Sequence, residues 1–149
     1  MEKQDVIIVT DPGVDDATAL MYAIYCGQIN IKLLAVAGGN GPISNAVNNA
    51  LYLMELFKQD IPVAVGLDHP LKRPPKYALN AQGKGGLGGL KVNPKKLTTK
   101  PIEKPAKDAM YEILKNSNKK MTIIAIGPMT SVAEMLLEYP DAKKYIKEI

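Results

Sequence analysis

The sequence predicts an α/β fold in which an open, mostly parallel, Rossmann-like sheet is flanked by helices. Three observations lead to this prediction. Short runs of apolar, often β-branched residues recur without polar alternation, which is typical of strands buried between two helical layers. Segments with helical periodicity alternate with these runs, and glycine- or proline-rich turns follow several of them. The alternation indicates parallel strands joined by right-handed crossovers.

The first part of the chain supplies three strands and two helices. Residues 6–9 read Val-Ile-Ile-Val and are expected to form the first strand, which an apolar helix over residues 15–26 follows. A second strand is expected over residues 31–37 and a second helix over residues 44–58, with a Gly-Gly-Asn-Gly-Pro turn between them. The run Pro-Val-Ala-Val-Gly at residues 62–66 predicts a short third strand.

The rest of the chain begins with a long irregular segment. Residues 67–101 lack clear periodicity and hold five prolines and five glycines, so we expect a functional loop that could cover the site as a lid. A helix over residues 106–115, a fourth strand over 121–126 and a helix over 131–138 follow. A last short helix is expected over residues 141–149.

The composition excludes several classes of function. With 149 residues, 46% of them hydrophobic, the chain fits one domain with ample core. The net charge of +4 would suit a polyanion, but one arginine, one phenylalanine and no tryptophan leave little for base recognition, so nucleic acid is not an expected partner. The single cysteine, Cys26, excludes an internal disulfide and agrees with a reducing compartment. With no signal peptide and no bilayer-spanning apolar run, we expect a cytoplasmic protein without a membrane partner.

Three carboxylates form the chemical centre of the sequence. Asp11, Asp15 and Asp16 lie in Thr-Asp-Pro-Gly-Val-Asp-Asp just after the first strand, where ligands bind in parallel sheets. Pro12 favours an extended Asp11, and Gly13 permits a sharp reversal, so the three carboxylates can face a common point. A lone aspartate here would be a helix cap or a first-turn acid. Three such acids repel one another unless protons or a cation compensate.

Hard oxygen ligands of this kind select Mg²⁺ or Ca²⁺, and Ca²⁺ takes about six to eight oxygens. Other turns must therefore contribute ligands. The turn at residues 38–42 offers Asn40, which could equally be a turn residue in left-handed geometry. The turn at residues 127–131 offers backbone carbonyls around Ile126, which could equally be an ordinary strand end. His69 is interpreted as an exposed loop histidine rather than a general acid.

The sequence around these residues resembles the N-terminal part of the inosine-uridine preferring nucleoside hydrolase family. The segment Asp-Pro-Gly-Val-Asp-Asp-Ala at residues 11–17 is similar to the family's N-terminal signature. Further similar segments are Val-Ala-Gly-Gly-Asn at 36–40, Asn-Ala-Leu at 49–51, the strand at 62–66, the glycine-rich run at 83–89 and Gly-Pro-Met-Thr-Ser at 127–131.

The resemblance implies Ca²⁺-dependent cleavage of the N-glycosidic bond of ribonucleosides, giving ribose and a free base. By the same resemblance, Asp11 and Asp16 would ligate Ca²⁺ together with the backbone carbonyl of Ile126. Asp15 would bind a ribose hydroxyl, and Asn40 would support the sugar end of the site. Asp11 would also be the catalytic residue that takes a proton from water. A Mg²⁺-dependent phosphatase is a weaker alternative, because the Asp-Pro-Gly turn lacks that chemistry's usual nucleophile and acid spacing.

The chain departs from the family pattern at several positions. Val9 replaces an aspartate, Gln82 replaces a histidine that opens the glycine-rich loop in many members, and Ser131 replaces the usual asparagine. Thr18 replaces a valine or isoleucine. The contacts to the leaving base are therefore not predicted.

Family members are also considerably longer than this chain. Residues 1–149 are expected to be the N-terminal portion of the hydrolase domain, so the fold would be truncated relative to the family. A sheet that ends at the fourth strand would leave that strand's edge unpaired, which predicts a homo-oligomer or a complementing C-terminal chain. The alternative function is a catalytically incomplete fragment that binds calcium and ribose.

Overall fold

The computed structural model describes residues 3–149, and within them five strands form one sheet. The strand order is β3-β2-β1-β4-β5, and every neighbouring pair is parallel. The strands are β1 (Gln4–Thr10), β2 (Ile29–Val36), β3 (Val63–Val65), β4 (Met121–Ala125) and β5 (Ile146–Glu148). The predicted α/β class with an open parallel sheet is confirmed.

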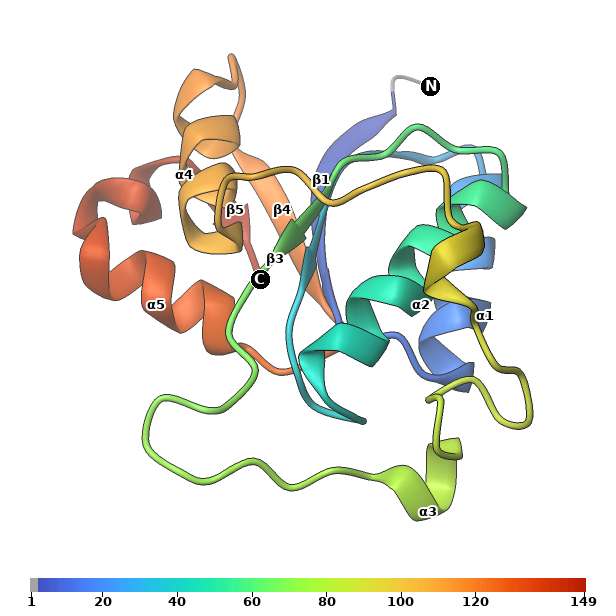
Figure 1. Cartoon of the computed structure of the whole chain (residues 1–149). Coiled ribbons are helices and arrows are strands. Elements are labelled where there is room, and N and C mark those ends of the chain that lie inside the picture. Colours follow the sequence, from blue (N-terminus) through green and yellow to red (C-terminus); the bar gives the residue numbers. More distant parts are fainter. Residues whose placement is uncertain (1–2) are drawn as a thin grey trace.

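Helices cover both faces of this sheet (Figure 1). The α-helices are α1 (Val14–Tyr25), α2 (Ile43–Leu56), α3 (Leu79–Gln82), α4 (Ala106–Asn116) and α5 (Thr130–Glu138), and the 3₁₀ helices are η1 (Pro94–Lys96) and η2 (Pro140–Lys144). Helices α1 and α2 lie on one face, and α4 and α5 lie on the other. No helix in residues 3–149 is long and apolar enough to cross a membrane.

The central position of strand β1 in the sheet explains why its sequence is apolar without alternation. Val6 and Ile8 pack into the core under α1 and α2, whereas Ile7 and Val9 pack into the core under α4 and α5. All four side chains are at most 2% exposed. Because both faces of the central strand are covered, a single polar residue here would lie in one of the two cores.

The end of the chain differs from the prediction. The helix expected over residues 141–149 is wrong, because η2 and the short strand β5 take its place. The backbone N–H of Met121 in β4 donates to the Tyr145 carbonyl at 3.0 Å, and β5 then pairs with β4. Hydrogen-bonding groups on the edge of β4 thus override the local helical pattern, and the expectation that this edge is unpaired is also wrong.

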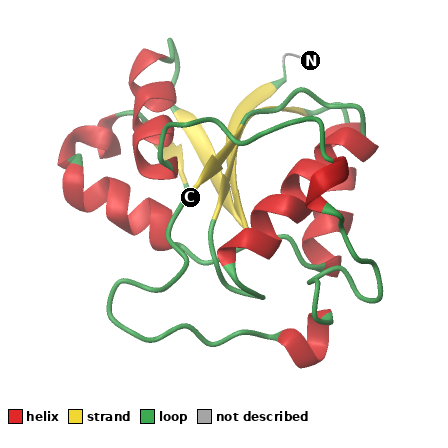
Figure 2. Cartoon of the chain, viewed as in Figure 1, coloured by secondary structure: helices red, strands yellow, loops and turns green. Residues whose placement is uncertain are grey.

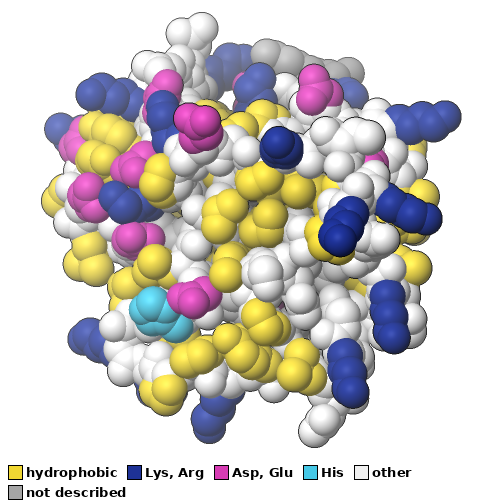
Figure 3. Space-filling model, in the orientation of Figure 1, with side chains coloured by type: hydrophobic (Ala, Val, Ile, Leu, Met, Phe, Trp, Pro, Cys, Tyr) yellow, Lys and Arg dark blue, Asp and Glu magenta, His cyan; other side chains and the backbone are white. Residues whose placement is uncertain are grey.

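The segment between β3 and α4 passes below the carboxyl ends of the strands before it returns along α1 and α2 (Figures 1 and 2). It is mostly irregular, as predicted, apart from α3 and η1. Its backbone is fixed to α2, because Glu55 Oε1 accepts hydrogen bonds from the backbone N–H groups of Thr98 and Thr99 at 2.7 Å each. These bonds, led by that of Thr99, and the bonds from the hydroxyl groups of the same two threonines lower the pKa of Glu55 to about 2. Within the same segment, His69 lies at the surface beside the carboxylate of Asp68, which confirms an exposed loop histidine (Figure 3).

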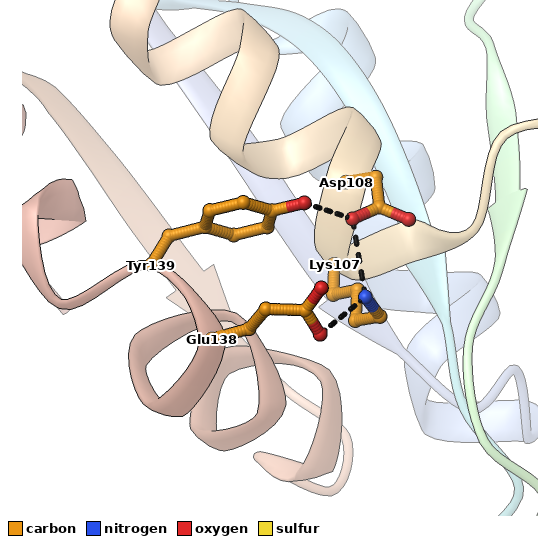
Figure 4. A network of polar contacts seen from close by, with 4 residues as sticks. All are labelled: Lys107, Asp108, Glu138 and Tyr139. Carbon is orange, nitrogen blue, oxygen red and sulfur yellow. Dashed lines mark hydrogen bonds and ion pairs between the residues drawn. The ribbon is translucent and has the colours of Figure 1, made fainter.

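A polar network fixes α5 against α4 (Figure 4). The Lys107 ammonium lies 3.2 Å from Asp108 Oδ1 and 2.5 Å from Glu138 Oε2, and the Tyr139 hydroxyl donates to Asp108 at 2.6 Å. The Tyr139 ring stacks on Tyr111 with centroids 4.0 Å apart. The network therefore joins the C-terminal end of α5 to the first turn of α4.

Candidate active site

Asp11 lies where the strand order reverses, directly after β1. The chain runs from β1 to β2 and β3 on one side of the sheet, and later to β4 and β5 on the other. Such a switch point is where open α/β sheets bind ligands. The Asp11 side chain is buried, and the backbone N–H of Asn40 donates to its Oδ2 at 2.7 Å. The Asn40 amide also donates to the Asp11 backbone carbonyl, at 3.0 Å.

Glycines from two other turns lie against the Asp11 carboxylate. A Cβ placed on Gly39 would collide with Asp11 Oδ2, and one placed on Gly127 would lie 2.6 Å from Oδ1. No side chain can therefore replace either glycine without moving the carboxylate. The predicted meeting of the turns after β1, β2 and β4 is confirmed.

Asp16 is the second buried carboxylate of the site. It lies in the first turn of α1 and is 3% exposed. The Thr10 hydroxyl donates to its Oδ1 at 2.5 Å, and the Gly13 backbone N–H donates to its Oδ2 at 3.4 Å. Asp16 therefore contributes to the start of α1, as the simpler interpretation held, while its burial beside Asp11 goes beyond that role.

The electrostatics of this pair are unfavourable in the absence of a cation. Burial raises the pKa of Asp11 to about 6, and the neighbouring charge of Asp16 adds to the rise against the opposing Asn40 hydrogen bond. Burial likewise raises the pKa of Asp16, with a contribution from the charge of Asp15. In both cases only hydrogen bonds favour the ionised form. This is the environment that a bound cation would relieve.

Asp15 is separate from the buried pair. It is exposed on α1, and its Oδ1 accepts a hydrogen bond from Gln82 Nε2 at 3.1 Å. Within residues 3–149 no group of three histidine, cysteine or acidic side chains is placed to hold a metal ion. The three neighbouring aspartates therefore divide into a buried pair and one exposed carboxylate. A hard cation at the pair needs backbone, water or ligand oxygens as well.

The role of Ile126 is not determined by its contacts. Its backbone N–H donates to the Val9 carbonyl at 2.9 Å, which places the residue beside the end of β1, and its side chain is exposed. That its carbonyl ligates a metal stays a prediction.

Two polar residues at the site were not predicted from the sequence. Asn49 is 2% exposed on α2, and its amide donates to the carbonyls of Pro12 at 3.0 Å and Gly85 at 2.8 Å. Gln82 accepts a hydrogen bond from the Val14 backbone N–H at 2.9 Å. The available signal for Asn49 was an amide on the apolar side of a helix, since a buried amide must find partners.

A hollow of about 340 Å³ lies behind Gly39, the glycine that contacts Asp11, although neither Asp11 nor Asp16 lines it. Gly39 and Pro128, which flank Asp11, form one side of it, and loop residues including Arg73 and Lys76 form the other. A larger hollow of about 750 Å³ lies at the opposite end of the sheet, around Gln4 and the turn after α4. The smaller hollow is the one on the side of the sheet where Gly39 lies against Asp11.

The comparisons with known proteins agree with this geometry. Residues 6–149 match the family model described as inosine-uridine preferring nucleoside hydrolase. The chain is 35% identical to the non-specific ribonucleoside hydrolase RihC of Salmonella newport (strain SL254), over 97% of this chain and 46% of that protein. It therefore spans about half the length of the curated relatives that it matches.

Solved structures show the same relationship. The plant nucleoside hydrolase PpNRh1 superimposes with a TM-score of 0.88 at 31% identity, over 97% of this chain and 46% of that one. The purine-preferring ribonucleoside hydrolase from Gardnerella vaginalis gives a TM-score of 0.86 at 26% identity, over 96% and 46%. The sequence match, the shared fold and the aspartate turn at its switch point place this chain in the inosine-uridine preferring nucleoside hydrolase family.

Proposed function

We propose that the chain carries the metal and ribose part of a Ca²⁺-dependent nucleoside hydrolase site. The observation that carries this proposal is the buried pair Asp11 and Asp16, whose raised pKa values call for a cation. The relatives support the substrate class, since their names describe hydrolases of ribonucleosides. The reaction would convert a ribonucleoside and water into ribose and a free base.

The donor set fits a hard cation. Asp11 and Asp16 offer carboxylate oxygens, and the Ile126 carbonyl is the proposed third protein ligand. The absence of side chains at Gly39 and Gly127 lets both turns lie directly against the Asp11 carboxylate. When bound, Ca²⁺ would supply positive charge that holds ribose hydroxyls and a water molecule at the site.

The residues of the chain would divide the chemistry among them. Asp11 takes a proton from the attacking water, and the buried negative charge stabilises the oxocarbenium-like transition state. Asp15 binds a ribose hydroxyl with its exposed carboxylate. Asn40 holds Asp11 through its backbone N–H and side-chain amide, so the carboxylate stays oriented toward the sugar. The acid that protonates the leaving base must come from another residue, because the amide of Gln82 cannot donate a proton in this way.

A second candidate follows from the length of the match. Because the chain spans 46% of the curated relatives, it could act as a calcium- and ribose-binding unit that assembles with a separate C-terminal chain or with another copy. In both candidates residues 1–149 are the N-terminal portion of the hydrolase domain, and the loop at residues 67–101 serves as the lid. A cytoplasmic location, where ribonucleosides are available for salvage, is part of both.

Release of ribose from inosine and uridine, measured with Ca²⁺ and with a chelator, tests the proposal. Calcium-dependent release that Asp11→Asn abolishes and Asp60→Asn preserves would support the hydrolase, since Asp60 is an exposed aspartate outside the site. Calcium binding without any release would favour the binding unit instead. A chain that neither binds calcium nor releases ribose would refute both candidates.

A further inference from the structure

Gln82 connects the glycine-rich loop to the start of α1. It is the last residue of α3, and its amide makes two hydrogen bonds to residues 67 and 68 positions away in sequence. Its Oε1 accepts from the Val14 backbone N–H at 2.9 Å, and its Nε2 donates to Asp15 Oδ1 at 3.1 Å. One planar amide thus contacts both a helix N-terminus and a carboxylate of the candidate site.

The first of these bonds replaces a missing helix cap. The N-cap residue of α1 is Gly13, which has no side chain to accept from the first backbone N–H groups. A Cβ on Gly13 would lie 2.8 Å from both Gln82 Cδ and Asn40 Nδ2, so the glycine leaves the space that the glutamine fills. The loop therefore supplies the cap that the local sequence lacks.

The second bond holds only one oxygen of Asp15. No hydrogen bond to Asp15 Oδ2 is present among residues 3–149, and the side chain is exposed. A carboxylate with one oxygen held by an amide is fixed in direction, while the other oxygen is available to a hydroxyl group. Restricting the rotamers before binding reduces the entropy lost when the ligand arrives.

Gln82 is itself held by the loop and by α2. Its carbonyl accepts from the Gly88 backbone N–H at 2.8 Å, and the amides of Asn45 and Asn49 donate to the carbonyls of Lys84 and Gly85 at 3.0 and 2.8 Å. Docking of the loop on α2 therefore determines where the Gln82 amide lies.

We propose that Gln82 is a positioning residue for ribose binding, because it orients Asp15 and makes that orientation depend on the docked glycine-rich loop. The proposal rests on the proposed function, in which Asp15 contacts a ribose hydroxyl. It assigns Gln82 a role in sugar affinity that is separate from metal binding, since the Gln82 amide bonds to Val14 and Asp15 and, within residues 3–149, not to Asp11 or Asp16.

Two substitutions separate this role from simple capping. Gln82→Glu keeps an acceptor for the Val14 N–H but removes the donor to Asp15 and adds a like charge, whereas Gln82→Ala removes both bonds. We expect both to weaken ribose binding about tenfold in calorimetry with Ca²⁺ present, while only Gln82→Ala lowers the melting temperature. Calcium affinity should change less than about threefold in either, and Asn80→Ala, an exposed change on the same helix, should leave all three quantities unaltered. Wild-type ribose affinity in Gln82→Glu would overturn the proposal.

Amide hydrogen exchange tests the link between Asp15 and the glycine-rich loop without a need for ribose binding. If the wild-type chain binds no ribose, the proposed function fails, but the link between Asp15 and the loop is still measurable. Asp15→Ala should then speed exchange of the Gly86 and Gly88 amides, which are bonded within the loop, several-fold. The control Asp60→Ala should leave the exchange of both amides unchanged. Unchanged exchange at both glycines would refute the role of Gln82.

Discussion

Asp11→Asn should stabilise the chain in the absence of metal while abolishing its response to calcium. The Asp11 carboxyl has a pKa of about 6 in the fold against 3.8 for the free side chain, a difference of about two units. At neutral pH this corresponds to about 3 kcal/mol of stability lost by keeping the group ionised. An asparagine removes the charge, and its side-chain oxygen can still accept the Asn40 N–H.

The expected gain is measurable by thermal unfolding at pH 7.5 in a chelator. For a chain of this size each kcal/mol corresponds to roughly 2–4 °C, so a gain of even half the full value raises the melting temperature by about 3 °C or more. Asp60→Asn provides the control for removing one negative charge at an exposed position. Calcium should raise the melting temperature of wild type and of the control but not of Asp11→Asn. An Asp11→Asn protein that is less stable than wild type in chelator would refute the electrostatic reasoning.

Four further outcomes follow from the same contacts. Because the folded chain binds the Asp11 proton more tightly than the unfolded chain, the contribution of Asp11 to metal-free stability should be full below about pH 4 and be lost as the pH rises through about 6, with calcium reversing this loss in pH-dependent melts. Asn49→Ala leaves the buried Pro12 carbonyl and the partly buried Gly85 carbonyl without this donor and should cost about 2–3 kcal/mol in denaturant unfolding, unlike Asn48→Ala. Gly127→Ala should weaken calcium binding at least about tenfold in calorimetry, because its Cβ would meet Asp11 Oδ1. Ser131→Ala should not destabilise the fold, since the buried hydroxyl has no hydrogen-bond partner among residues 3–149, and a loss above about 1 kcal/mol would contradict this.

The sheet could be predicted because its determinants are local. The run at residues 6–9 has no polar side, so it must lie between two covered faces, and in the structure Ile7 and Ile8 lie in opposite cores. The strand β5 could not be predicted, because it forms only by pairing with the edge of β4, a partner about 25 residues earlier in the chain. Local pattern favoured a helix there, and a long-range ladder replaced it.

The candidate site was predictable in part for a related reason. Asp11 and Asp16 follow one strand, and parallel topology alone brings the turns of Asn40 and Gly127 beside Asp11. The sequence does not show that Asp15 is exposed and bonded to Gln82 while the other two carboxylates are buried, since that depends on side-chain direction. Gln82 reaches the site through the path of a loop that has no periodicity, so sequence spacing carried no information about its contacts.

Calorimetric titration of Ca²⁺ into wild type, Asp11→Asn and Asp16→Asn at neutral pH tests the central claim most directly. The account predicts one calcium site in the wild-type chain that either substitution removes, while Asp60→Asn retains it. Calcium binding that persists unchanged in both site variants, or no binding by the wild-type chain, would contradict the assignment of the buried aspartate pair as a metal site.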